Sequence, residues 1–260
     1  MRDFFPTEIF RERTQCMDSL EKARNIRLYY CDCLVGMNRI ETGSVDLVLC
    51  DLPYGTTNCP WDTVIPFEPL WEHYRRILKP KGAVVLMAAQ PFATDLINSA
   101  RPLFRYDLVW EKTAPVGHAN SHKMPLRSHE LILVFYKRLP KYHPQGLVPL
   151  EQPIVRKASE KKAGGVYHHG LGKQSVQRFT NYPRSILRFS NRKDKRVHPT
   201  QKPVALMEYL VRTYTDPGDL VVDNCMGSGT TAVACLNSGR RFVGFELDKQ
   251  YYDTACHRVE

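Results

Sequence analysis

Short apolar runs, rich in β-branched and aromatic residues, recur along the chain and are separated by stretches of helical periodicity. These runs predict strands at residues 26–31, 45–50, 83–88, 106–110, 131–136, 219–223 and 241–245. Apolar positions that follow the 3.6-residue repeat predict helices over residues 67–79, 203–214 and 231–237. Because near-continuous apolar strands that alternate with helices are typical of parallel sheets covered on both faces, the pattern predicts an α/β fold with a mainly parallel sheet.

Positive charge is concentrated in one part of the chain. The whole chain has a formal net charge of +10, but residues 114–196 hold 17 Lys and Arg against 4 Asp and Glu, and the remainder is net negative. This segment also holds six of the nine histidines, with aromatic residues between its charges. A solvated basic loop is the alternative, but so large an excess favours a surface that contacts nucleic acid.

Composition excludes several classes of protein. Hydrophobic residues make up 43%, charged residues 25%, and the mean hydropathy is −0.39, which is typical of a folded, soluble, cytoplasmic chain. The sequence holds no apolar run of the roughly 18 to 20 residues that span a bilayer, so we expect no membrane partner. The eight cysteines lack the repeated pairs of a zinc site and are interpreted as reduced thiols, so no metal is expected.

A glycine-rich turn follows the strand predicted at 219–223. The turn contains Gly227, Ser228 and Gly229, and a helix follows it, so a ligand could approach bare backbone at a helix start. Glu246, after the next strand, is placed to accept hydrogen bonds from ribose hydroxyls. The pattern predicts a nucleoside cofactor, with an NAD-type dinucleotide as the alternative. Because only 14 residues follow Glu246, the other strands must come from the N-terminal half, in a circularly permuted order.

A second motif, Asp51-Leu-Pro-Tyr54, directly follows the strand at 45–50. Pro53 restricts Leu52 to extended geometry and turns its carbonyl outward. The Asp51 carboxylate and the Leu52 carbonyl are two acceptors, and Tyr54 is a flat face beside them. Two acceptors next to a stacking ring suit the exocyclic amine of a nucleobase, although the same residues also occur in ordinary turns.

These motifs occur in a recognisable order together with His198-Pro-Thr-Gln-Lys-Pro203 and Asp223-Asn-Cys-Met-Gly-Ser-Gly-Thr-Thr231. In that order, residues 26–260 resemble the amino-methylating DNA methyltransferases of the permuted beta class. The resemblance implies a seven-stranded, mainly parallel, circularly permuted methyltransferase sheet with an inserted target-recognition region. It divides the chain into a catalytic half at 1–113, a basic target-recognition region at 114–196 and a cofactor-binding half at 197–260.

The resemblance also assigns roles to single residues. The implied catalytic residues are Asp51, Leu52, Pro53 and Tyr54. The residues implied to bind S-adenosylmethionine are Asp32, Thr200, Lys202, Asp223, Gly227, Ser228, Gly229, Thr230 and Glu246. Among these, Gly227 and Gly229 would let the cofactor approach, Glu246 would bind its ribose and Asp32 would contact its adenine side. Thr200 and Lys202 would hold its methionine carboxylate.

This sequence departs from the family pattern at two places. Leu52 replaces the usual first proline, which keeps a carbonyl acceptor but loosens the turn. Asn224 and Cys225 replace a Pro-Phe pair, which removes an aromatic ring expected beside the cofactor.

The expected reaction is transfer of a methyl group to adenine N6 in duplex DNA, after base flipping and by direct in-line attack. Cytosine N4 is the alternative target, because both amines suit two acceptors. The sequence also leaves open a catalytically silent DNA-binding relative and an NAD-dependent oxidoreductase, although the oxidoreductase would leave the basic segment without a role. The partners expected are double-stranded DNA and, by resemblance, a second copy in a homodimer, within a restriction-modification setting. The expected DNA contacts are Arg127, Arg156, Arg178, Arg184, Arg188 and Arg192.

Overall fold

The structure is a computed structural model, and it describes residues 25–57, 59, 62–156, 174–191 and 201–260. Its described residues form two compact units. The smaller unit consists of residues 144–184, and the larger unit contains the rest.

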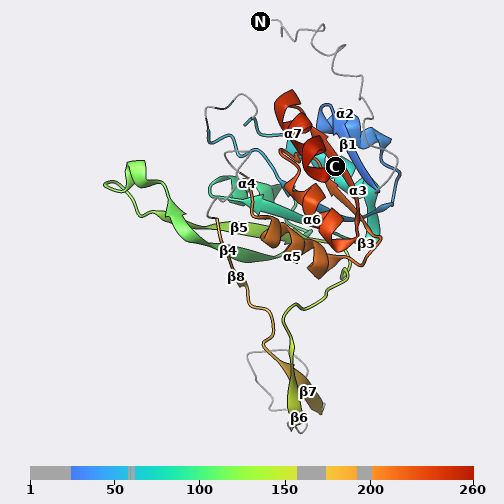
Figure 1. Cartoon of the computed structure of the whole chain (residues 1–260), viewed down its shortest axis with the longest axis vertical. Coiled ribbons are helices and arrows are strands. Elements are labelled where there is room, and N and C mark those ends of the chain that lie inside the picture. The colour runs from blue at the N-terminus through green and yellow to red at the C-terminus, as the bar shows by residue number, and fades with distance from the viewer. Residues whose placement is uncertain (1–24, 58, 60–61, 157–173, 192–200) are drawn as a thin grey trace, which may run out of the picture. The chain divides into compact units, whose positions relative to one another are not determined.

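An eight-stranded sheet forms the centre of the larger unit, with the strand order β1-β10-β9-β2-β3-β5-β4-β8 (Figure 1). The strands are β1 (Ile26–Tyr30), β2 (Val45–Asp51), β3 (Leu78–Ala88), β4 (Phe104–Val116), β5 (Arg127–Phe135), β8 (Ile186–Phe189), β9 (Leu220–Asp223) and β10 (Arg241–Glu246). Strands β1, β10, β9, β2 and β3 pair in parallel, and β5 runs antiparallel to both β3 and β4. The predicted mainly parallel α/β fold is therefore confirmed.

The predicted number of strands is wrong by one. Strand β8 pairs in parallel with the outer side of β4 and makes the sheet eight-stranded. The strand is only four residues long, Ile-Leu-Arg-Phe, with Leu187 buried, Phe189 half-buried and the other two exposed, so its sequence is too short to stand out as an apolar run. Only its pairing with β4 makes this segment a strand.

Helices cover both faces of the sheet (Figure 1). They are α2 (Cys33–Gly36), α3 (Phe67–Ile77), α4 (Phe92–Ser99), α5 (Val204–Tyr214), α6 (Thr230–Ser238) and α7 (Lys249–Val259), with 3₁₀ turns η1 (Met37–Arg39) and η2 (His118–Asn120). Val85 and Met87 pack in one core cluster with α5, α6 and α7, whereas Val84 and Leu86 pack in the other with α3 and α4. Alternate side chains of β3 thus fill two separate cores, which explains the unbroken apolar run at its residues 83–88.

The smaller unit is a two-stranded antiparallel ribbon made of β6 (Val148–Arg156) and β7 (Ser175–Thr180). Most of its described residues are exposed. Arg156, Arg178 and Arg184 belong to this unit. The predicted recognition region, 114–196, thus includes this ribbon together with β5 and β8 of the main sheet, and its boundaries stay a prediction.

The sheet topology brings distant residues to the same edge. Parallel strands β1, β10, β9 and β2 end at the carboxyl edge, where ligands bind in open α/β sheets. Because β5 is antiparallel to β3, its first residues lie at that same edge, with Leu131 opposite Ala88. Glu130 is paired with Trp110 of β4. The carboxyl edge therefore receives residues from the beginning of β5 as well as from the ends of the parallel strands.

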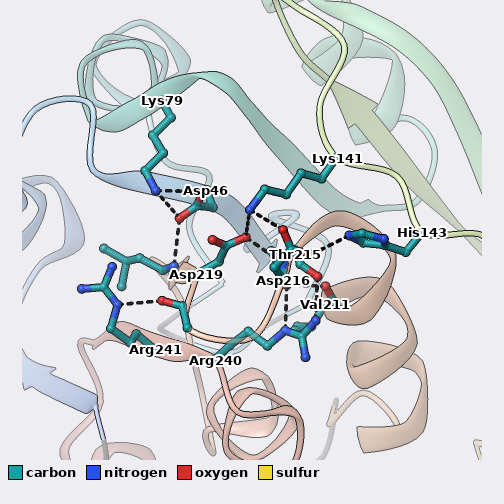
Figure 2. A network of polar contacts seen from close by, with 12 residues as sticks. Asp46, Lys79, Lys141, His143, Val211, Thr215, Asp216, Asp219, Arg240 and Arg241 are labelled. Carbon is teal, nitrogen blue, oxygen red and sulfur yellow. Dashed lines mark hydrogen bonds and ion pairs between the residues drawn. The ribbon is translucent and has the colours of Figure 1, made fainter.

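The opposite edge, where the parallel strands begin, is closed by a set of polar contacts that we call the strand-start network (Figure 2). Its ionisable members are Asp46, Lys79, Lys141, His143, Asp216, Asp219, Arg240 and Arg241. Asp46 accepts hydrogen bonds from the Lys79 ammonium at 2.7 and 2.9 Å and from the Leu220 backbone N–H at 3.0 Å. It thereby joins the beginnings of three strands, β2, β3 and β9.

Among the described residues, no helix is both long enough and apolar enough to cross a membrane.

Candidate active site and cofactor cavity

A cavity of about 590 Å³ opens at the carboxyl edge of the sheet. Of the residues predicted from the sequence, those that line it are Asp32, Asp51, Leu52, Pro53, Tyr54, Arg127, Lys202, Asp223, Gly227, Ser228, Thr230 and Glu246. The two predicted groups of residues, catalytic and cofactor-binding, therefore share one continuous space. Gly229 and Arg188 do not line it, and Thr200 and Arg192 lie outside the described residues.

The two glycines of the turn, Gly227 and Gly229, have different structural roles. Gly227 has a φ of +53°, and its N–H donates to Glu246 Oε2 at 2.8 Å. Gly229 has a φ of +78°, and a Cβ added there would lie 2.9 Å from the Cβ of Ala255. Gly229 therefore permits α6 to pack against α7, whereas Gly227 faces the cavity. Arg258 of α7 braces the turn further by donating to the Ser228 carbonyl at 2.6 Å, a contact without a sequence signal.

Two carboxylates stand on neighbouring strands beside this turn. Glu246 ends β10 and is in register with Tyr30 of β1, and Asp32 follows β1 two residues later. Besides the Gly227 N–H, Glu246 accepts the N–H groups of Leu247 and Asp248 at 2.9 and 2.8 Å. Burial raises the pKa of Glu246, and these three N–H donors act against that rise. Asp32 caps α2 through Oδ1 and lines the cavity.

The substituted pair Asn224 and Cys225 forms part of the cavity floor. Asn224 is buried, accepts a hydrogen bond from the Tyr74 hydroxyl at 2.6 Å, and points its amide nitrogen at the sulfur atoms of Cys225 and Cys33. The amide thus links β9 to α3 on the covered face. All the cysteines of the described residues are free thiols.

Asp223, which ends β9, is almost fully buried at 3% exposure. It accepts a hydrogen bond from the Thr231 hydroxyl at 2.6 Å and another from the Cys225 N–H at 3.1 Å. Burial raises its pKa to about 6, even though these donors act in the opposite direction. Asp223 therefore ties the glycine turn to the first turn of α6.

Side-chain packing and a hydrogen bond hold the Asp51-Leu-Pro-Tyr54 motif in place. Leu52 is 4% exposed and packs in the core under the motif, so the residue that replaces proline anchors the turn by burial. The Tyr54 ring stacks on Phe92 with centroids 5.1 Å apart, and its hydroxyl donates to Asp51 Oδ1 at 2.7 Å. The expectation that Leu52 loosens the turn is therefore incomplete, because side-chain burial supplies a restraint of its own.

Asp62 is a positioning residue that the sequence did not indicate. It is 8% exposed and accepts the backbone N–H groups of Gly55, Thr56 and Thr57 at 2.9, 2.9 and 2.7 Å. Burial acts to raise its pKa, but these hydrogen bonds hold the pKa below its ordinary value. The carboxylate thereby fixes the backbone that follows Tyr54.

Four charged side chains meet at the cavity wall, and we call them the cavity network. They are Asp51, Lys112, Glu130 and Lys202. The Lys202 ammonium lies 2.5 Å from Asp51 Oδ2 and 3.2 Å from Glu130 Oε2, and the Lys112 ammonium lies 2.6 Å from Glu130 Oε1. The network balances two negative charges against two positive charges in a mostly buried place.

The pKa values of the groups in this network are shifted in different directions. Burial raises the pKa of Asp51, with Glu130 adding to the rise and Lys202 opposing it. Burial also acts to raise the pKa of Glu130, but Lys202 and Lys112 together hold it below its ordinary value. For Lys202, burial works to lower the pKa, and the two carboxylates hold it above its ordinary value instead. Glu130 and Lys112 were missed from the sequence, where neither belongs to a motif and each lies in a strand that holds other polar residues.

Comparison with known proteins identifies the family. A family model described as DNA methylase matches residues 45–257 of the chain. The chain belongs to this DNA methylase family.

Two curated relatives of the methylase are type II methyltransferases. The enzyme M.HpaI of Haemophilus parainfluenzae is 26% identical over 249 residues, which cover 90% of this chain and 74% of M.HpaI. The enzyme M2.DpnII of Streptococcus pneumoniae is 24% identical over 273 residues, which cover 90% of this chain and 89% of M2.DpnII.

Solved structures share the fold of the methylase. The S-adenosylmethionine complex of M1.HpyAVI aligns with a TM-score of 0.61 and 24% identity, over 90% of this chain and 99% of that one. The cytosine-N4-specific PvuII DNA methyltransferase aligns with a TM-score of 0.67 and 18% identity, over 92% of this chain and 87% of that one.

Family membership makes the methylase an S-adenosylmethionine-dependent DNA methyltransferase. The cavity fits this cofactor. It has the size of a small-molecule site, a backbone turn that requires a left-handed glycine at Gly227, and two carboxylates on adjoining strands that can accept hydrogen bonds from hydroxyls and an amine.

Proposed function

We propose that the methylase modifies the N6 amine of adenine in duplex DNA. The observation that carries this proposal is the position of Asp51, which stands beside Tyr54 in the same cavity as the glycine turn. A methyl donor and a target amine bound in one cavity can meet without a carrier group on the protein. The choice of adenine rests on the aspartate that begins the motif, which the resemblance associates with adenine.

Cytosine N4 is the second candidate. The PvuII methyltransferase, whose fold aligns with a TM-score of 0.67, is cytosine-N4-specific. Both bases carry an exocyclic amine with two N–H donors, so the acceptors of the motif suit either one.

Residues of the turn and its neighbours would hold the cofactor, which supplies the methyl group. Glu246 would accept the ribose hydroxyls and Asp32 the adenine side, because both carboxylates stand at the cavity wall. Gly227, Ser228 and Thr230 would contact it along the turn. Lys202 would bind the methionine carboxylate, with Thr200 beside it in the motif.

The catalytic residues would act on the amine itself. Its nitrogen is a poor nucleophile because the lone pair is delocalised into the ring. We infer that Asp51 and the Leu52 carbonyl accept its two hydrogens, which localises the lone pair and stabilises the positive charge that develops on nitrogen. Tyr54 would stack on the flipped base, with its ring held from behind by Phe92 and its hydroxyl by Asp51.

DNA would be held by the arginines named from the sequence. Arg127 lines the cavity and is exposed, and Arg188 lies 4.0 Å from Glu111 on the neighbouring strand. Arg156, Arg178 and Arg184 belong to the ribbon unit, where most side chains are exposed. Exposed arginines suit both phosphate contacts and bidentate contacts with guanine.

One experiment tests the reaction and the base together. Purified protein is incubated with S-adenosylmethionine and unmethylated genomic DNA, and the DNA is digested to nucleosides and analysed by mass spectrometry. N6-methyladenine supports the proposal, whereas N4-methylcytosine keeps the mechanism and overturns the choice of base. Absence of both products, with the cofactor still bound, would identify a silent relative. The Asp51→Asn variant is the control that ties any product to this cavity.

A further inference from the structure

The cavity network contains two side chains to which the proposed mechanism gives no role. Glu130 and Lys112 come from β5 and β4, the antiparallel part of the sheet, and both side chains are largely buried, at 16% and 9% exposure. Burying charged groups is costly unless they are paired, and a structural pair would be expected to satisfy all of its atoms. This pair does not.

The unsatisfied atom faces Lys202. Glu130 Oε1 is engaged by Lys112 at 2.6 Å, whereas Glu130 Oε2 is buried and accepts no hydrogen bond from the described part of the chain, even though the Lys202 nitrogen is only 3.2 Å away. The same nitrogen donates to Asp51 Oδ2 at 2.5 Å. Glu130 thus attracts Lys202 by charge, while the well-formed hydrogen bond of Lys202 goes to Asp51.

The position of Lys202 affects the carboxylate oxygens of Asp51, which the proposed reaction needs as acceptors. Tyr54 already donates to Asp51 Oδ1, and Lys202 donates to Oδ2, so both oxygens are engaged before any target amine arrives. A lysine bonded to Oδ2 withdraws charge from the oxygen and competes with the amine for it. A second carboxylate that attracts the same lysine weakens this competition.

We propose that Glu130 is a positioning residue that draws Lys202 away from Asp51 and so keeps an oxygen of Asp51 available to the target amine. Lys112 sets the strength of this attraction, because it neutralises part of the charge of Glu130. The proposal rests on the proposed function for the role of Asp51, but the electrostatic part concerns the protein alone. Glu130 acts through Lys202 and needs no contact with DNA or cofactor.

The surroundings of Asp51 make the effect measurable. The titratable and charged groups that face it are Lys202 from the segment just before α5, Tyr54 from its own loop, Glu130 from β5, Cys50 from β2 and Asp223 from β9. Glu130 raises the pKa of Asp51, and Lys202 lowers it. Removing the charge of Glu130 therefore acts twice in one direction, because the negative neighbour is lost and Lys202 binds Asp51 more closely.

The test is a carboxyl ¹³C NMR titration of aspartate-labelled full-length protein without cofactor or DNA, with the Asp51 signal assigned from Asp51→Asn. We expect Glu130→Gln to lower the pKa of Asp51 by about one unit, the size expected of a nearby charge, and Lys112→Met to raise it. The double variant Glu130→Gln/Lys112→Met removes one charge of each sign and keeps the pocket neutral, so it serves if Glu130→Gln fails to fold. We expect it to lower the pKa as well.

Kinetics give the second measurement. Glu130→Gln should lower kcat about tenfold, the effect of one charge-assisted hydrogen bond, and move the acid limb of the pH–rate profile to lower pH. Opposite shifts in the two single variants support the proposal, since a merely structural role would not reverse sign. Unchanged pKa values, or shifts in the same direction, overturn it. If the NMR shifts appear but no methylated base is formed, the electrostatic coupling stands and the proposed function fails.

Discussion

The two edges of the sheet carry the same kinds of charged side chain and use them differently. In the strand-start network, Asp46 and Asp219 each accept a backbone N–H as well as a lysine (Figure 2). In the cavity network, the donors that the described residues offer to Asp51 and Glu130 are side chains, and within the same residues one oxygen of Glu130 has no hydrogen bond.

The lysines of the two networks also differ in their exposure to solvent. Lys79 and Lys141 are 40% and 39% exposed, whereas Lys112 and Lys202 are each 9% exposed. Carboxylates that accept backbone N–H groups are fixed by the fold and hold strands together. Carboxylates that face a cavity and share a buried lysine interact strongly with one another and with any ligand that enters, because the local dielectric is low. The two networks therefore differ in both their hydrogen-bond donors and their solvent exposure, as expected if the first is structural and the second serves the proposed reaction.

The largest effect is expected at Asp51. The Asp51→Asn variant removes the charge that would stabilise the developing ammonium but keeps the size of the side chain, so turnover should fall about 10²- to 10³-fold. The free energy of unfolding should fall by no more than about 3–5 kcal/mol, the cost of breaking a buried pair, because Lys202 keeps Glu130 as a partner. Radiolabelled methyl transfer and calorimetric stability measure the two quantities. Unchanged turnover would remove Asp51 from the mechanism.

The buried carboxylate of Asp223, at the cavity edge of the sheet, should make the free energy of unfolding depend on pH. Its folded pKa, about 6, lies above its ordinary value of 3.8, so the folded protein binds more protons between these values. The contribution of Asp223 to stability is thus complete below pH 4 and is lost as pH rises toward 6, by about 3 kcal/mol. In Asp223→Asn this loss should be absent, as urea unfolding at pH 4, 5, 6 and 7 would show. An identical pH dependence in both proteins would contradict the assignment.

Asp46 is the matched structural acid. In Asp46→Ala the Leu220 N–H and the Lys79 ammonium lose their acceptor, and we expect a loss of about 1–3 kcal/mol in unfolding free energy. Turnover per folded molecule should stay at the parent value, because the cavity lies at the other edge. A loss of turnover with unchanged stability would reverse the roles of the two networks.

The smallest effect is expected at Lys141. Its partners Asp216 and Asp219 are reached across a surface that is open to solvent, so Lys141→Met should change the unfolding free energy by less than about 1 kcal/mol. Salt should weaken the effect further, and denaturation at low and high ionic strength measures this. A salt-independent loss of several kcal/mol would show that this network is as strongly coupled as the buried one.

Much of the fold was predictable because each strand carries its own local signal. The apolar runs located every parallel strand from β1 to β3 and both strands near the C-terminus, and the periodicity located α3, α5 and α6 within a few residues. Helix α3 ends at Ile77, two residues before its predicted end, because β3 begins at once with Leu78. Helices α4 and α7 were not predicted, and neither were the ribbon strands β6 and β7, whose residues are mostly exposed and carry no clear pattern.

The site was predictable to the extent that its residues form contiguous motifs. Asp51 to Tyr54 and the glycine turn are local strings, and the sequence alone showed that each follows a strand. Glu130, Lys112, Asp62 and Arg258 belong to no such string. Their roles depend on which strands become neighbours and on which atoms burial leaves without water, and these are consequences of packing between residues far apart in the chain. The sequence by itself predicted the family and the cofactor, which are confirmed, and the acceptors, which stay a prediction, because their signals are local motifs. Only the tertiary structure decided that Asp51 shares its lysine with a second carboxylate, because that contact depends on packing between distant strands.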